Sequence, residues 1–432
     1  MQQLLVGKQK AVGKARNRYF TLPAMTVVAS WFPYAGLPFG KSSQLSLCVL
    51  LTGISVFVQR VNLVRLPIGI IVFVALPLLA GAMQVILGLP LALIAAVVTW
   101  PLYTSPLLLA QGISGPDLRR HLLVLTRIMM GLASLFALVQ QATLVRTGTI
   151  LFAKYYNLQP YTPLDLDSIA RYVRRPFGWF PEPSLLAIAM CLGSLMLMVL
   201  VPKSLERVDQ ILILVALATA VFAKSGLVFV ITPFVLLAGI RRLSSGRSKR
   251  VASLLLPILG GAAYFLVWRE RGAAVSSGQN FSWTDRWYSI QIPLASTLTS
   301  LKHFLFGFGP GSTTQIFESG YAQANSSHFH NPPSDVLSLL GGLIVQVGWP
   351  VALTMLILLL TYMHKALRST TGDAWFATFV TAGWVLIGLL SLAYLQFSLY
   401  WMAGSVFSLH HATQRKEAHH DATTISKSAS AG

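Results

Sequence analysis

The sequence predicts an all-α, polytopic helical membrane protein with about 12 transmembrane helices and two long external (periplasmic) loops. Of its residues, 54% are hydrophobic and 11% are charged, whereas about a quarter of the residues in a soluble domain carry charge. Apolar runs of helical-span length recur along the chain, while the strands of a membrane barrel would be shorter and would alternate in polarity. Basic residues also occupy every second loop between these runs.

The apolar runs set the positions of the expected spans. They cover residues 20–37, 42–58, 66–82, 84–100, 121–143, 183–201, 208–223, 226–240, 252–268, 334–361, 374–393 and 395–411. Prolines interrupt residues 87–109, so a bent or re-entrant segment is an alternative there. Residues 1–19 form a basic leader without a small-residue cleavage site, and the first span is therefore expected to be a signal anchor.

The charges predict the orientation of the bundle, residues 20–411. The loops that the positive-inside rule assigns to the cytoplasm hold Lys8, Lys10, Lys14, Arg16, Arg18, Arg60, Arg65, Arg119, Arg120, Lys203, Arg207, Arg241, Arg242, Arg247, Lys249, Arg250, Lys365, Arg368, Arg415 and Lys416. Both termini are then cytoplasmic, and the polar tail 412–432 is expected to be disordered. This bias accounts for most of the net charge of +20, so no nucleic-acid partner is needed to explain it.

The two long external loops, residues 144–182 and 269–333, are basic as well. Loops longer than about 12–15 residues are usually functional or disordered. Basic residues on the outer side run against the positive-inside rule, so a function that needs cations there is expected. The planar guanidinium group of arginine can bind two phosphate oxygens at once. Contact with lipid headgroups is the alternative for any single arginine. The cluster of Arg171, Arg174 and Arg175 favours a bound anion.

Five motifs resemble those of bacterial O-antigen ligases and O-antigen or exopolysaccharide polymerases. RPFGWFPEPSLLAIAM, from Arg175, resembles the family's "G-x-x-x-E-P-S-x-x-A" stretch, and FAKSG resembles its "S-R-S-G" turn with Lys224 in place of the arginine. TDRWYSI and LFGFGPG resemble its "R-x-x-x-W" helix and "G-x-G-x-G" turn. HNPPSDVLSLLG matches the ligase signature at His330, Asn331 and Gly341, but Ile344 departs from it. The resemblance covers residues 170–410.

This resemblance implies a metal-independent glycosyltransferase of the bacterial inner membrane with its active site on the periplasmic face and no cofactor. The donor is a glycan on an undecaprenyl diphosphate carrier, and the acceptor is a glycan or a lipid. Polymerase is slightly favoured over the alternative, an O-antigen ligase that transfers to the lipid A core. A regulator of chain length is a further partner that the resemblance allows.

The chemistry of such a transfer assigns roles to residues of the long loops. Arg175 and Arg286 would stabilise the leaving diphosphate, with Arg174 and Lys224 behind them. His330 would accept the proton of the acceptor hydroxyl. Asn331 is expected to cap a helix that begins at Pro332, whose positive end keeps a nearby imidazole neutral. The alternative is that His330 only bonds backbone at a helix entry.

Three further features have open interpretations. His328 would contact a headgroup or the acceptor, and Glu182 would either orient an arginine or cap the helix that begins at Pro183. Asp165 and Asp167 resemble a metal-binding acid pair, but the loop offers few further oxygen ligands, so no metal is expected. Cys48 and Cys191 lie in apolar runs and predict neither a disulfide nor a metal site.

A transporter or flippase is the rival class. Such proteins bind their substrate near the bilayer midplane, between internal repeats that carry ionisable residues. This chain lacks a convincing repeat, and its polar chemistry is concentrated in the external loops. Arg127 lies inside an expected span and is either functional or reaches the cytoplasmic interface. It is not included in the expected site.

Overall fold

A computed structural model describes the parts of the chain that form the bundle. These are residues 22, 24–32, 35–39, 43–59, 68–86, 104–110, 115–151, 175–180, 183–202, 204–243, 246, 261, 281–309, 312–320, 336, 338–390 and 399–414. Their regular structure is helical apart from one antiparallel hairpin, β1 (Gly36–Phe39) with β2 (Ser43–Ser46). The hairpin occupies the junction of two expected spans, 20–37 and 42–58, and corrects their bounds, since helix resumes only at Leu47.

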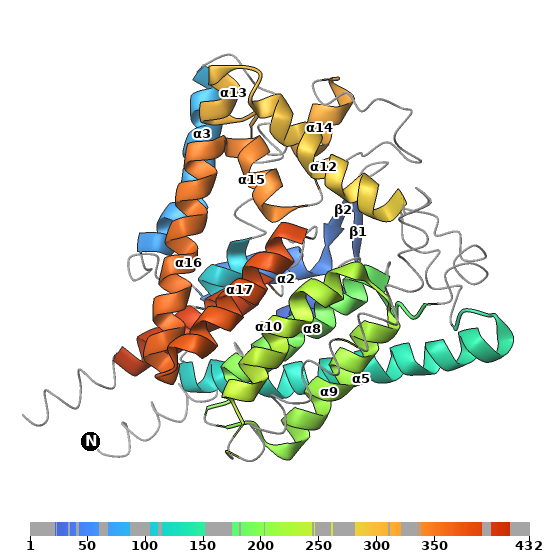
Figure 1. Cartoon of the computed structure of the whole chain (residues 1–432). Coiled ribbons are helices and arrows are strands. Elements are labelled where there is room, and N and C mark those ends of the chain that lie inside the picture. Colours follow the sequence, from blue (N-terminus) through green and yellow to red (C-terminus); the bar gives the residue numbers. More distant parts are fainter. Residues whose placement is uncertain are drawn as a thin grey trace, which may run out of the picture.

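The described helices follow one another along the chain in this order. They are α2 (Leu47–Gln59), α3 (Ile68–Ile86), α5 (Gly115–Thr147), α8 (Pro183–Leu200), α9 (Arg207–Phe222), α10 (Gly226–Arg241), α12 (Phe281–Thr297), α13 (Leu301–Phe306), α14 (Ser312–Glu318), α15 (Leu339–Val347), α16 (Trp349–Thr371) and α17 (Ala374–Leu390). Residues 104–110 and 399–414 are helical as well. In Figure 1, α12, α13 and α14 lie above the group of α8, α9 and α10, and α16 runs down one side.

Three described helices are long and apolar enough to cross a membrane. They are Arg119–Thr147, Pro183–Leu200 and Trp349–Thr371. Shorter apolar helices lie at Leu47–Val58, Ile68–Met83, Val228–Arg241 and Ala374–Leu389. Length and composition therefore support a helical membrane protein. The number of spans stays a prediction, because the runs expected at 84–100 and 252–268 fall largely outside the described residues.

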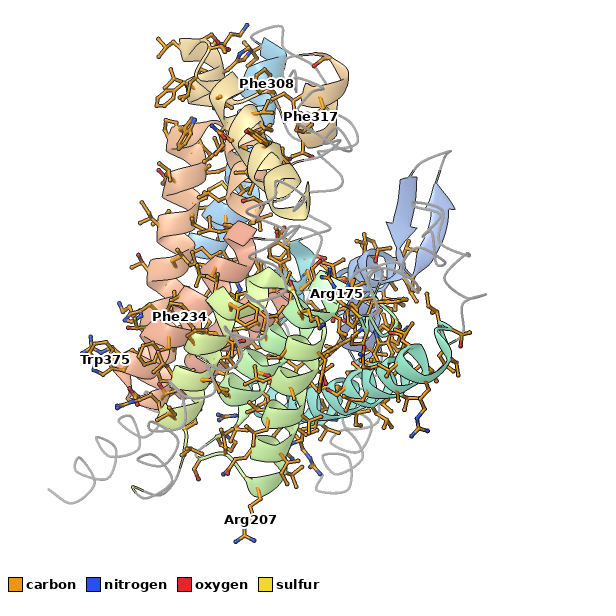
Figure 2. The ribbon with its side chains drawn as sticks, turned by 45° about the vertical axis from the view of Figure 1, so that its right-hand side comes forward. Arg175, Arg207, Phe234, Phe308, Phe317 and Trp375 are labelled. Carbon is orange, nitrogen blue, oxygen red and sulfur yellow. The ribbon has the colours of Figure 1, made fainter. Side chains whose placement is uncertain are left out.

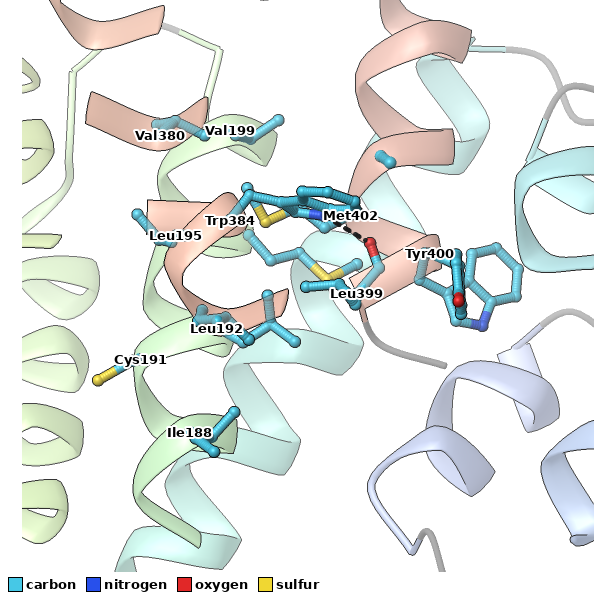
Figure 3. Close-up of a cluster of buried hydrophobic side chains, with 14 of the residues drawn as sticks. Ile188, Cys191, Leu192, Leu195, Val199, Val380, Trp384, Leu399, Tyr400 and Met402 are labelled. Carbon is cyan, nitrogen blue, oxygen red and sulfur yellow. Dashed lines mark hydrogen bonds between the residues drawn. The ribbon is translucent and has the colours of Figure 1, made fainter. Parts of the chain in front are cut away.

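Helix α8 lies at the centre of the bundle. It packs against α5, α9, α10 and α17, and 83% of its span is buried inside the protein. Figure 3 shows its apolar side chains meeting Trp384 of α17, whose indole nitrogen donates to the Leu399 carbonyl at 3.0 Å. Gly193 permits close approach, because a Cβ there would lie 2.8 Å from Trp31 and 2.9 Å from Met130.

One end of the bundle gathers the segments that the sequence assigns to the cytoplasm. Arg119 donates to the carbonyls of Leu200 (2.6 Å) and Val201 (3.0 Å), and Arg242 donates to those of Met198 and Val201. These carbonyls end α8 and have no partner within the helix. Burial and the nearby Arg119 charge lower the pKa of Arg242 to about 10. Which membrane side this end faces stays a prediction.

Arg127 bridges two helices near the same end. Its Nε lies 2.7 Å from Asp209 Oδ1 and its Nη2 lies 2.8 Å from Oδ2, while Nη2 also reaches Glu206 at 3.2 Å. Asp209 is fully buried in the first turn of α9. This two-pronged geometry joins α5 to α9, and it supports a structural role for the intramembrane charge.

The turn between α16 and α17 carries a testable pH dependence. Asp373 Oδ1 accepts from the Phe376 amide at 3.0 Å, and Oδ2 accepts from Arg241 Nε at 2.8 Å. Burial raises the pKa of Asp373, but these hydrogen bonds outweigh it, and the pKa is lowered from 3.8. A carboxyl with a lowered folded pKa stabilises the fold above its unfolded pKa and loses that contribution as pH falls through the folded pKa.

Asp373 directly precedes α17 and caps it by accepting from the Phe376 amide. We expect Asp373→Ala to lower the free energy of unfolding by about 1 kcal/mol at neutral pH, as the loss of an N-cap does. Measured in detergent from pH 6 down to about pH 2, the difference between the variant and the parent should shrink below the unfolded pKa of 3.8. A difference that stays constant over this range would contradict the assignment.

The apolar run 334–361 does not form one span. Val336 and Ser338 are not helical, α15 begins at Leu339, and Gly348 separates α15 from α16. The Ser338 hydroxyl accepts from the Gly341 amide at 3.1 Å and caps α15. Asn331 and Pro332, expected to begin this helix, lie outside the described residues, and the next described N-cap is Ser338. The expectation of a continuous helix from Pro332 through this run is therefore wrong.

Candidate functional site

The structure brings together two residues that the motifs single out. Arg175 Nη1 donates to the Lys224 carbonyl at 3.3 Å, although the two residues are separated by 49 positions. Arg175 precedes α8, and Lys224 lies between α9 and α10. Figure 2 places Arg175 at the end of these helices opposite to Arg207. The sequence predicts that this end is external, and the structure brings two of the predicted anion-binding residues together there; the side of the membrane that it faces stays a prediction.

The FAKSG turn is tight and conformationally unusual. Ala223 donates to Thr219 O at 3.0 Å and Lys224 donates to Val221 O at 2.8 Å as α9 ends. Lys224 then adopts φ 47°, a left-handed conformation that is uncommon for a residue with a side chain. Ser225 follows as the extended N-cap of α10. Such outliers often mark functional sites, and this one supports the choice of Lys224.

The RPFGWF turn is fastened to its neighbours through backbone and indole groups. Gln140 Oε1, from α5, accepts from the amides of Phe177 and Gly178, each at 2.8 Å. Gly178 supplies a φ of +60°. Trp179 Nε1 donates to the Trp31 carbonyl at 2.9 Å. Sequence reasoning missed Gln140, which is fully buried; its signal was a polar pair, Gln140 and Gln141, inside an apolar run.

The electrostatics of this end favour an anion. Arg175 donates to the Lys224 carbonyl, so its guanidinium lies against the turn that carries the lysine, and α10, a helix of 16 residues, begins at Gly226 directly after this turn. The N-terminus of such a helix carries a positive partial charge, although the Val228 amide is already bonded to the Ser225 carbonyl at 3.1 Å. A phosphate or diphosphate group offers several acceptor oxygens to such an arrangement.

The described part of the LFGFGPG motif, through Gly309, forms a corner that is hydrogen-bonded to the end of α15. Phe308 donates to Val345 O at 2.7 Å and Gly309 donates to Gln346 O at 3.1 Å, so the turn pairs with the end of α15. Gly307 and Gly348 face each other with φ +68° and +82°. A Cβ on Gly307 would lie 2.7 Å from the Gly348 nitrogen. The motif therefore holds the junction between α15 and α16.

His303 belongs to this corner. Its amide donates to Ser300 Oγ at 3.1 Å, which caps α13, and its ring stacks on Phe308 with centroids 4.1 Å apart. Burial and the neighbouring Lys302 charge lower the pKa of His303, which favours a neutral imidazole. The packing of the ring indicates a structural role.

The remaining expected site residues cannot be placed against Arg175. Arg286 lies on α12, but its side chain is outside the described part. Outside the described residues lie Arg171, Arg174, Glu182, His328, His330, Asn331, Asp165 and Asp167. Among the side chains that are described, no three His, Cys, Asp or Glu residues form a group that could hold a metal ion.

Comparison with known proteins leaves the family of the chain open. No protein-family model matches it, and no curated protein matches it.

Proposed function

We propose that the protein is an external-face membrane glycosyltransferase that moves a glycan from an undecaprenyl diphosphate carrier to a sugar hydroxyl. The observation that carries the proposal is the hydrogen bond from Arg175 to the Lys224 carbonyl. It joins two motifs that lie far apart in the sequence at one cationic end of the bundle. Such an end complements the diphosphate of a lipid-linked donor.

The proposed step is a displacement at the anomeric carbon. The acceptor hydroxyl oxygen attacks this carbon, the bond from carbon to phosphate oxygen breaks, and its electron pair leaves with the diphosphate. Arg175, Arg286, Arg174 and Lys224 stabilise the charge that develops on the leaving oxygens. His330 takes the hydroxyl proton. Glu182, Asn331 and His328 support the site.

Two acceptors fit this donor. The EPS stretch that begins α8 favours a polymerase, which extends another lipid-linked repeat. The His330–Asn331 spacing also suits the alternative, an O-antigen ligase that transfers to the lipid A core. A deletion strain separates them: single repeats on the core indicate a polymerase, and bare core with accumulated long lipid-linked chains indicates a ligase. The pairing of Arg127 with two carboxylates disfavours a flippase that would use this charge in transport.

Reconstituted protein with lipid-linked glycan tests the transfer. We expect Arg175→Ala to lower the rate by about 10- to 100-fold, since a charge-assisted contact to the leaving group contributes a few kcal/mol. Arg175→Lys should recover part of the loss, because the charge remains but the fork is lost. His330→Ala should lower the rate by about 100-fold or more.

Arg207→Ala is the matched control, because Arg207 is exposed at the opposite end of the bundle. It should keep the parental rate. Parental rates in Arg175→Ala and His330→Ala, or movement of the glycan across the bilayer without release of carrier lipid, would overturn the proposal.

A further inference from the structure

We infer that Gln140 is a positioning residue for Arg175, acting on the turn that carries the arginine. This inference rests on the proposed function, in which Arg175 binds the donor diphosphate. Gln140 lies on α5, fully buried, and comes from a part of the sequence outside all five motifs. It reaches the turn 37 and 38 residues further along the chain.

Gln140 makes three hydrogen bonds to the peptide backbone of the turn, and this set of bonds is called the clamp below. Gln140 Oε1 accepts from the Phe177 and Gly178 amides, both at 2.8 Å, and its Nε2 lies 3.5 Å from the Gly178 carbonyl. One side-chain amide thereby satisfies two adjacent backbone donors in a buried place. Buried backbone groups without partners are costly, so the clamp favours this one placement of the turn over α5.

Pro176 limits how far Arg175 can move relative to the backbone that Gln140 holds. Its ring fixes its own φ near −65°, and it restricts the preceding residue, Arg175, to extended conformations. The chain between the clamp and the arginine therefore has few soft torsions. The hydrogen bond from Trp179 to the Trp31 carbonyl holds the other side of the turn. Displacement of Phe177 and Gly178 should then move the Arg175 guanidinium away from Lys224.

A simpler alternative is that Gln140 only satisfies buried amides and stabilises the bundle. That role would lower stability without changing where Arg175 lies in the folded protein. Two measurements separate these roles: the proximity of positions 175 and 224, and the affinity for undecaprenyl diphosphate. Each is compared with control variants.

Position is measured by cross-linking. Arg175→Cys with Lys224→Cys introduces one thiol on each of the two neighbouring turns, while the native Cys48 and Cys191 are buried. In intact membranes, a short bis-maleimide should join the pair. Adding Gln140→Met, which keeps the side-chain length and removes both polar atoms, should lower the initial cross-linking rate by about tenfold, since short reagents require close geometry.

Two further variants make this measurement specific. Gln141→Met is the matched control one residue along, because the Oε1 atom of Gln141 is buried without a hydrogen-bond partner among the described residues; it should leave the rate unchanged. Gln140→Glu keeps an acceptor oxygen for the two amides and should restore most of the rate. Equal rates in Gln140→Met and Gln141→Met would overturn the inference, as would a failure of Gln140→Glu to exceed Gln140→Met.

Affinity for undecaprenyl diphosphate is measured on protein without the two introduced cysteines, so that Arg175 and Lys224 are both present. We expect Gln140→Met to weaken binding by about tenfold, approaching Arg175→Ala, as misplacement of a binding group does. Asp373→Ala, at the other end of the bundle, lowers stability but should bind as the parent does. Weak binding by the parent, equal to Arg175→Ala, would refute the proposed function. Parental binding by Gln140→Met, with Arg175→Ala impaired, would refute the positioning role alone.

Discussion

Gly348→Ala is expected to cost about 4 kcal/mol or more of unfolding free energy, among the largest effects of a single substitution. Gly348 has φ +82°, and a Cβ there would collide with the Leu305 carbonyl and lie 2.7 Å from the Phe306 nitrogen. Both obstacles are backbone atoms, which cannot rotate away as a side chain would. Since Gly307 packs against the same corner, the collision would part the LFGFGPG turn from α15 and α16.

The opposite end of α16 provides the control for this substitution. Gly372 also has a left-handed φ, +70°, but a Cβ there would meet nothing within 4 Å. Gly372→Ala should therefore cost only the conformational strain, about 1–2 kcal/mol. Chemical denaturation of both variants in detergent measures the difference. If both lose equal stability, the close contact at Gly348 contributes nothing.

Arg127→Met is expected to cost about 3–5 kcal/mol, because it leaves the buried Asp209 carboxylate without its cation. The pair meets at 2.7 Å, and Asp209 is fully buried. Adding Asp209→Asn removes the uncompensated charge, so the double variant should be more stable than Arg127→Met. Unfolding free energies of the two single variants and the double variant measure the coupling.

An exposed pair provides the comparison for Arg127. Arg241 and Asp373 meet at 2.8 Å, with 44% and 24% of their side chains exposed. Arg241→Met should cost less than about 1 kcal/mol, as surface ion pairs do. If Arg127→Met cost no more than Arg241→Met, the two-pronged pair to Asp209 would not hold α5 against α9.

The sequence predicted the central helices closely and the helix breaks poorly. Residues 183–201, 208–223 and 226–240 were expected, and α8, α9 and α10 cover Pro183–Leu200, Arg207–Phe222 and Gly226–Arg241. Proline and charged residues bound these runs and end them clearly. The corner at Gly348 was missed because hydropathy sums apolar side chains and is insensitive to φ. The hairpin of Gly36–Phe39 with Ser43–Ser46 was missed because hydropathy places its residues at the ends of two spans and in the connection between them, and does not report backbone pairing between short strands.

The candidate site was predicted in part. The ordered motifs pointed to Arg175 and Lys224, and the structure brings them within hydrogen-bond distance. Gln140 was missed because a polar pair inside an apolar run does not reveal that one of its members contacts a turn 37 residues later. The Arg127 partners were missed likewise, since Asp209 and Glu206 lie 82 and 79 residues away from Arg127 in the sequence.

The arginines that close α8 bear on how membrane orientation and folding are linked. Arg119 and Arg242 belong to the basic segments that are predicted to set the direction of insertion, yet both donate to carbonyls at the end of α8. The same two side chains would therefore act twice. During insertion their charge keeps a segment on one side of the membrane, and in the folded bundle their N–H groups pair with the carbonyls at the end of α8. Neutral replacement of either residue should impair assembly of the bundle even where neighbouring lysines and arginines preserve the insertion signal.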